Sequence, residues 1–104
     1  MNRNQLLKRI KSNLQAVYDD RLRGIVLYGS EARGEAAPES DIDLLVLLDG
    51  PVVLGQELEV IIRALYPLQL EIDRPIHVSP VNADTYWAGE FALYRNVKKE
   101  GIWA

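Results

Sequence analysis

The most informative stretch of the chain reads Gly29-Ser30-Glu31-Ala32-Arg33-Gly34 and, after six further residues, Asp41-Ile42-Asp43-Leu44-Leu45-Val46. Residues 25–28 before it are apolar and of strand length, and they stop at the glycine–serine turn. A second strand is predicted from Asp41 to Leu48. The small, polar residues 31–40 leave room for one helical turn and a loop. If the two strands run antiparallel, the turn and the aspartate pair meet at the same edge of a sheet.

Helical periodicity flanks this region on both sides. Apolar residues recur at three- and four-residue steps in residues 4–20 and 53–66, so both segments are predicted to be amphipathic helices. Pro67 is expected to end the second helix at Tyr66, because proline lacks the backbone N–H that a helix interior needs. The same spacing predicts a last short helix from Ala83.

Residues 68–81 alternate apolar and polar side chains and predict a third strand. Pro75 and Pro80 place this strand at the edge of the sheet or break it in two, because proline cannot donate to a strand ladder. The resulting element order, αββαβα, predicts an α/β fold with a small mixed sheet and helices packed mainly on one face.

Length and charge limit the possible functions. The 104 residues are predicted to form a single domain, 1–104, since domains typically have about 100–150 residues. The 12 basic and 15 acidic residues give a net charge of −3, which argues against broad electrostatic binding to nucleic acid or to an anionic membrane. We therefore expect no direct nucleic-acid partner, and any polyanion must be held locally.

The chain has no cysteine and a single histidine, His77, which rules out disulfides and argues against a clustered zinc site. Its longest apolar run, Leu44 to Leu48, is far shorter than the roughly 20 residues of a membrane span. The N-terminus lacks the apolar core of a signal peptide. We expect an unprocessed cytoplasmic protein that does not bind membranes.

The aspartate pair is the first half of a predicted site. Asp41 and Asp43 are two residues apart on a strand, so both carboxylates project from one face, about 6–7 Å apart along the backbone. That face continues with Leu45 and Leu47, which confines the polar part to one end. Two carboxylates favour magnesium, which shares its other ligands with water and substrate phosphates. An Asp-x-Asp alone is more often the solvated start of a strand.

The glycine–serine turn is the second half. Gly29 lets the backbone approach phosphate oxygens, and the Ser30 hydroxyl and the N–H groups of a helical turn can donate hydrogen bonds to them. Arg33 lies three residues after Ser30 and would balance phosphate charge. A lone Gly-Ser is only a turn, but together with the aspartate pair it predicts adjoining phosphate and metal sites.

The pattern GSxxRGxxxxxSDIDLLV, residues 29–46, resembles the minimal nucleotidyltransferases of the DNA polymerase β-like superfamily. These are small prokaryotic proteins usually encoded beside a HEPN-domain partner. The resemblance covers the whole chain in length and element order. It implies a nucleotidyltransferase fold and magnesium-dependent transfer of a nucleotidyl group from a nucleoside triphosphate to an acceptor hydroxyl. In such pairs the small protein is similar to an antitoxin, which uses ATP to add AMP to a tyrosine of an RNase-like HEPN toxin.

The resemblance also assigns roles to residues. It implies that Asp41 and Asp43 are catalytic and bind the metal, and that the nucleotide is bound by the glycine–serine turn and the following arginine, Gly29, Ser30 and Arg33. The superfamily's third carboxylate follows a proline and an apolar residue on the next strand, where this chain has Pro75-Ile76-His77.

His77 therefore stands where the resemblance implies an acid, and this places catalytic activity in question. A neutral imidazole can act as a general base, so His77 is a candidate catalytic residue. Glu71 and Asp73 lie nearby in the sequence and could replace the acid in another register. The competing interpretation of His77 is an ordinary strand histidine.

Five of the eight aromatic residues fall in the last nineteen positions: Tyr86, Trp87, Phe91, Tyr94 and Trp103. They either cover the small sheet or form part of an interface, where aromatic residues are enriched. We expect a hetero-oligomer with a HEPN-domain toxin, or a homo-oligomer when the chain is alone. Two alternatives to an active transferase stay open. One is a weak or inactive nucleotide-binding antitoxin that neutralises its partner by complex formation, and the other is a nucleotide-sensing domain.

Overall fold

The computed structural model describes residues 1–37 and 39–104, so Pro38, within the predicted loop, lies outside the described residues. A four-stranded mixed sheet with the order β3-β2-β1-β4 forms its centre. β1 runs antiparallel to both β2 and β4, and β2 runs parallel to β3. The strands are β1 (Leu22–Tyr28), β2 (Ile42–Leu48), β3 (Ile76–Asn82) and β4 (Ile102–Trp103).

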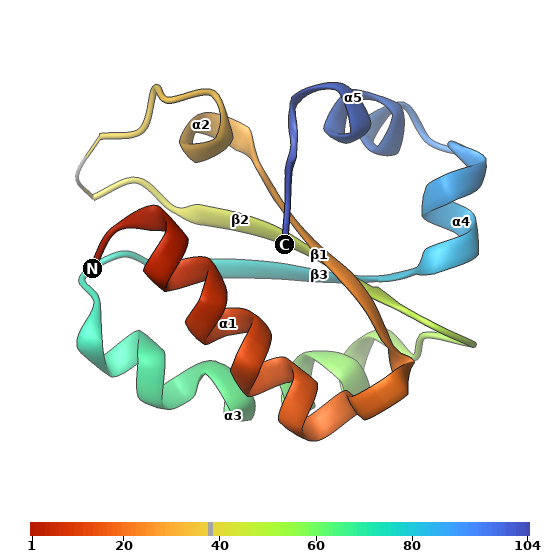
Figure 1. Ribbon diagram of the computed structural model, residues 1–104. Helices are drawn as coiled ribbons and strands as arrows, with labels where there is room; N and C mark the ends of the chain where they lie inside the picture. Colours follow the sequence, from red (N-terminus) through yellow and green to blue (C-terminus); the bar gives the residue numbers. More distant parts are fainter. Residues whose placement is uncertain (38) are drawn as a thin grey trace.

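Helices cover both faces of this sheet, and the two long ones share a face. Figure 1 shows α1 and α3 side by side below the sheet, with α4 and α5 above it. The helices are α1 (Arg3–Tyr18), a 3-10 turn η1 (Asp19–Arg21), α2 (Gly29–Ala32), α3 (Leu54–Glu71), α4 (Ala83–Ala88) and α5 (Ala92–Glu100). The predicted α/β fold with a small mixed sheet is confirmed, and the two long helices share one face as expected, while the shorter α4 and α5 cover the other face.

Alternation along the strands builds a separate apolar core on each face. On the side of α1 and α3, Leu44 and Val46 of β2 pack with the buried face of each long helix. On the other side, Leu45 and Leu47 pack against α4 and α5. β2 is therefore buried on both faces, which explains its nearly continuous apolar sequence.

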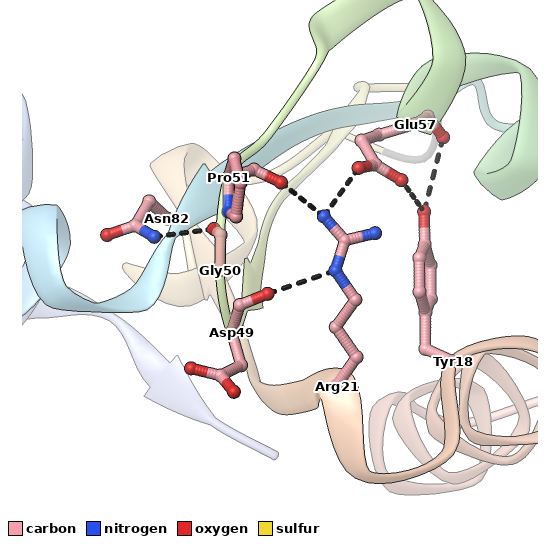
Figure 2. Close-up of polar contacts among 7 residues, drawn as sticks. All are labelled: Tyr18, Arg21, Asp49, Gly50, Pro51, Glu57 and Asn82. Carbon is pink, nitrogen blue, oxygen red and sulfur yellow. Dashed lines mark hydrogen bonds and ion pairs between the residues drawn. The ribbon is translucent and has the colours of Figure 1, made fainter.

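The buried polar group Glu57 connects the long helices to the loop that joins β2 to α3. Its carboxylate accepts hydrogen bonds from Arg21 Nη2 at 2.7 Å and from the Tyr18 hydroxyl at 3.0 Å. Arg21 also donates to the backbone carbonyls of Asp49 and Pro51 (Figure 2). This network fixes the end of α1 and the start of β1 against the first turn of α3.

The prediction that Pro67 ends the second helix is wrong. α3 continues through Pro67 to Glu71. Leu65 and Leu68, on either side of the proline, are buried in the core. Burying a leucine contributes about 1.5–3 kcal/mol, which offsets much of the roughly 3 kcal/mol that a proline costs inside a helix. Residues 68–71 are consequently helical, and the third strand is shorter than the predicted 68–81.

The edge position predicted for this third strand is confirmed. β3 is an outer strand of the sheet, so Pro80 is accommodated without breaking it. Pro75 comes just before β3, and its carbonyl accepts a hydrogen bond from the Ile42 N–H at 2.8 Å.

The C-terminal segment differs from the single short helix that was predicted from Ala83. Gly89, with φ +67°, adopts the left-handed conformation that ends α4, and α5 and β4 follow. Tyr86 is buried under these elements, whereas Trp87, Phe91 and Trp103 are largely exposed. Within the described residues, every helix is too short or too polar to cross a membrane.

Candidate active site

The strand register brings the predicted site residues into one row across the sheet. Tyr28 of β1 is the direct partner of Asp43 on β2, and Asp43 is the partner of His77 on β3. Directly opposed residues on neighbouring strands project from the same face. Asp41, two residues before Asp43, lies on that face just before β2 begins. The sheet thus places Asp41, Asp43 and His77 together at one end of the strands.

Short distances confirm that these three side chains form one cluster. His77 Nε2 lies 3.5 Å from Asp41 Oδ2, and His77 Nδ1 lies 3.9 Å from Asp43 Oδ1. The side chains of His77, Asp41 and Asp43 are 63%, 44% and 29% exposed, so a ligand can reach all three. His77 occupies the place beside the aspartate pair that the sequence pattern gave to a third acid.

The two alternative acids lie elsewhere. Glu71, at the end of α3, forms an ion pair of 2.7 Å with Arg9 of α1. Asp73 lines a groove together with Leu6 and Ile42. Leu6 and Ile42 belong to the core on the α1 and α3 side, which is the opposite face from Asp43. Neither acid therefore joins the cluster.

Gly29 packs directly against Asp43. β1 and β2 run antiparallel, which is the arrangement that places the turn after β1 next to the aspartate pair at the start of β2. Gly29 has φ +75°, and a Cβ atom at this position would lie 2.5 Å from Asp43 Oδ2. Glycine is thus required both by the left-handed backbone and by the close approach of the carboxylate. The turn and the aspartate pair share one site.

Ser30 and Arg33 belong to the turn that begins at Gly29. Ser30 lies in α2, and its carbonyl accepts a hydrogen bond from the Glu35 N–H at 2.9 Å, which closes the turn. The Arg33 guanidinium is near two acids, 3.2 Å from Glu35 and 3.7 Å from Glu100 of α5. These pairs are exposed and therefore weak.

Tyr28 is a site residue that the sequence pattern did not single out. It is half-buried beside Asp43, and burial raises the pKa of its hydroxyl above the ordinary value, while a side-chain hydrogen bond with Ser79 acts in the opposite direction. Its position directly before Gly29 was the available signal. Its place in the row could be recognised only from the register of β1 and β2.

The donor set bears on the metal that the sequence pattern implies. Among the described residues, no group of three or more His, Cys, Asp or Glu side chains is arranged so that it could hold a metal ion by itself. Asp41 and Asp43 supply two accessible carboxylates on one face. Such a set fits magnesium, which keeps several waters and takes further ligands from substrate phosphates.

Comparison with known families shows the family to which the chain belongs. Residues 3–103 match the model of the nucleotidyltransferase domain. The chain belongs to this family. Two relatives come from Methanocaldococcus jannaschii. "Putative protein adenylyltransferase MJ0604" is 29% identical over 102 residues, covering 97% of this chain and 96% of the relative. "Putative protein adenylyltransferase MJ0141" is 32% identical over 69 residues, covering 65% and 70%.

Solved structures share the fold of this nucleotidyltransferase domain. A chain in the crystal structure of a toxin–antitoxin with AMP-PNP superposes with a TM-score of 0.60 at 21% identity, covering 99% of this chain and 72% of that one. Spectinomycin adenyltransferase AAD(9) from Enterococcus faecialis, with ATP and spectinomycin, gives a TM-score of 0.66 at 17% identity, covering 98% and 48%. These similarities confirm the fold that the sequence resemblance implied.

Proposed function

We propose that this protein is an adenylyltransferase that moves AMP from ATP to a hydroxyl group of a protein partner, and that it serves as the antitoxin of a toxin–antitoxin pair. The observation that carries the proposal is the contact of the Gly29 turn with Asp43, beside Asp41 and His77. It brings together, at one accessible place, a turn proposed to bind phosphate, two carboxylates proposed to bind metal and a candidate base. The names of the two archaeal relatives and the toxin–antitoxin chain solved with AMP-PNP support it.

The binding roles follow from the chemistry of each group. Asp41 and Asp43 would hold Mg²⁺ together with the triphosphate. The backbone around Gly29 and the Ser30 hydroxyl would donate hydrogen bonds to phosphate oxygens, and Arg33 would balance their charge. Bound magnesium supplies charge neutralisation at the phosphates and at the leaving oxygen.

In the proposed reaction the acceptor hydroxyl oxygen attacks the α-phosphorus in line. A new phosphorus–oxygen bond forms to the acceptor, while the bond from the α-phosphorus to the bridging oxygen breaks and pyrophosphate leaves with the electron pair. The hydroxyl proton passes to the imidazole of His77. His77 Nε2 lies 3.5 Å from Asp41 Oδ2, so the imidazole is next to the proposed metal-binding carboxylates. His77 would thus act as the general base.

We further propose that the acceptor is a tyrosine of a HEPN-domain toxin, with which the protein forms a hetero-oligomer. The two archaeal relatives are named as protein adenylyltransferases, which supports a protein as the acceptor. This part of the proposal comes from the family resemblance, and a cytoplasmic location belongs with it.

A second candidate function is neutralisation by binding alone. The histidine at the third-acid position favours it, since an imidazole is not a magnesium ligand of first choice. The exposed aromatic side chains Trp87, Phe91 and Trp103 provide apolar surface that a partner could cover. In this case the aspartate pair would bind or sense nucleotide without transfer.

Two labels on ATP test the first function. The protein is incubated with Mg²⁺, its HEPN-domain partner, and ATP labelled at the α- or the γ-phosphate. We expect the α-label on the partner and the γ-label in pyrophosphate, with Asp43→Asn removing both signals. Asp49→Asn is the matched control, because Asp49 directly follows β2 at its other end and is exposed. Transfer of the γ-label, or full activity of Asp43→Asn, would overturn the proposed chemistry.

A further inference from the structure

Arg74, in the turn between α3 and β3, connects the segments that carry the candidate site. Its Nε donates a hydrogen bond to the Ser40 carbonyl at 2.8 Å, and its Nη2 donates to Glu31 Oε2 at 2.9 Å. The side chains of Arg74 and Glu31 are only 20% and 17% exposed. One guanidinium therefore joins α2 to the backbone just before Asp41, in a partly buried setting.

The position of Arg74 is itself fixed by Gln69 of α3. Gln69 Nε2 donates to the Arg74 carbonyl at 2.8 Å, and Gln69 Oε1 accepts from the Ile76 N–H at 3.0 Å. These two bonds hold the backbone on both sides of Pro75. The start of β3, which carries His77, is therefore held next to Arg74, the residue that also bonds to α2 and to the backbone before Asp41.

This arrangement bears directly on the geometry of the site. Glu31 directly follows Ser30, and Ser40 directly precedes Asp41, so Arg74 holds both ends of the connection from the turn to the aspartate pair. Arginine suits this task because its planar guanidinium makes several hydrogen bonds in fixed directions. Lysine carries its three donors on a single nitrogen and lacks this planar fork, so it would not reproduce both bonds in the same geometry.

We propose that Arg74 is a positioning residue, which holds the Gly29–Ser30 turn and Asp41 at the separation that one magnesium–triphosphate group needs. This inference rests on the proposed function for its effect on nucleotide. The structural effect of Arg74 does not depend on the proposed function. Loss of Arg74 leaves the partly buried Glu31 carboxylate without this ion pair and removes the hydrogen bond to the Ser40 carbonyl. The turn then loses its anchor while Gly29, Asp41 and Asp43 remain.

The test compares Arg74→Ala with Arg9→Ala. Arg9 also forms an arginine–glutamate pair, with Glu71 at 2.7 Å, but both side chains are exposed, at 42% and 52%. We measure the ATP Kd by titration calorimetry in Mg²⁺, and KM and kcat for the transfer. Arg74→Ala should weaken ATP binding about tenfold, the size expected for a lost charge-assisted hydrogen bond, and Arg9→Ala less than about twofold. Arg74→Lys should recover part of the loss.

Coupling to Glu31 distinguishes positioning from a general loss of stability. We expect the Kd of Glu31→Gln/Arg74→Ala to match that of Arg74→Ala alone, because both changes break one interaction. Losses that add independently, or equal Kd values for Arg74→Ala and Arg9→Ala, would overturn the proposal. If Arg74→Ala does not fold, Arg74→Lys and Glu31→Gln carry the same comparison.

Hydrogen exchange separates this inference from the proposed function. The amides of Gly34 and Glu35 donate to the carbonyls of Glu31 and Ser30, and they report on the turn without nucleotide. Exchange about tenfold faster in Arg74→Ala than in Arg9→Ala is the expected result, since loss of the anchor should favour local opening. Equal exchange rates would refute the anchoring role even if ATP binds. A wild-type protein that binds no ATP would refute the proposed function, and the exchange rates would still decide the role of Arg74.

Discussion

The carboxylate of Asp43 lies so close to Gly29 that a Cβ on this glycine would sit 2.5 Å from Asp43 Oδ2. The turn that is expected to bind phosphate and the strand that is expected to bind metal are therefore packed against each other. Any side chain at position 29 must displace the carboxylate or the turn.

Gly29→Ala should weaken ATP binding far more than Gly34→Ala does. Both glycines have positive φ values, +75° and +73°, so alanine costs roughly 1–2 kcal/mol of backbone strain at either position. A Cβ at Gly34 meets no atom within 4 Å, whereas a Cβ at Gly29 meets Asp43. We expect both variants to lose thermal stability, Gly29→Ala the more, and a rise in ATP Kd of at least about tenfold for Gly29→Ala alone. Equal Kd values in the two variants would argue against the shared site.

His77→Asn should slow transfer and leave nucleotide binding intact. Asparagine keeps polar character but cannot accept the proton of the acceptor hydroxyl, and general-base catalysis contributes about 10²–10⁴-fold. We expect kcat to fall by that order, with the ATP Kd unchanged within about threefold. His77→Asp, which adds the third carboxylate, should retain transfer. A wild-type rate in His77→Asn would exclude His77 as the base.

Glu57→Gln should lower stability at neutral pH and have less effect in acid. The hydrogen bond from Arg21, with a smaller one from Tyr18, holds the pKa of Glu57 below its ordinary value of 4.5. A lowered folded-state pKa stabilises the protein above pH 4.5, and this stabilisation is lost as pH falls through the folded value. We expect a loss of about 1–3 kcal/mol at pH 7. Urea unfolding at several pH values measures it.

Glu59→Gln provides the control for this carboxylate, because Glu59 is exposed and pairs with Arg63 one turn along α3. It should change stability by less than about 0.5 kcal/mol. A Glu57→Gln effect that is no larger than this, or one that grows in acid, would contradict the network drawn in Figure 2.

Tyr18→Phe tests the same network from the alkaline side. Burial, followed by the hydrogen bond to Glu57, raises the pKa of Tyr18 from 10.0 to about 12. A raised folded-state pKa means that this contribution is complete below pH 10 and is lost as pH rises toward 12. The stability of the wild type relative to Tyr18→Phe should therefore fall over this range. Tyr66→Phe, at an exposed position of α3, should show no such trend.

The local sequence correctly predicted those elements that are determined by the conformational preferences of neighbouring residues. The motif from Gly29 to Asp43 identified the turn, the second strand and the aspartate pair, because glycine and paired aspartates have strong local preferences. Nonlocal packing decided the rest. Leu68 is buried in the core between the sheet and the long helices, and this burial keeps α3 helical beyond Pro67. The two-residue strand β4 exists only through its pairing with Val26 and Leu27 of β1.

The candidate site shows the same division. Sequence placed His77 beside the aspartates only through a family pattern, and the parallel register of β2 and β3 now supplies the physical reason. Tyr28 and Arg74 carried no motif. The place of Tyr28 in the site depends on strand register. Arg74 bonds to Ser40 and Glu31, which precede it in the sequence by 34 and 43 positions. Such contacts cannot be read from neighbouring residues.

The most direct test of the central claim is the intact mass of the proposed HEPN-domain partner after incubation with ATP, Mg²⁺ and either the wild type or Asp41→Asn. The account predicts that the wild type adds AMP to the partner, on a hydroxyl side chain, and that Asp41→Asn leaves the partner unmodified. An unmodified partner that still forms a stable complex with the wild type would contradict the claim, and would favour an antitoxin that acts by binding alone.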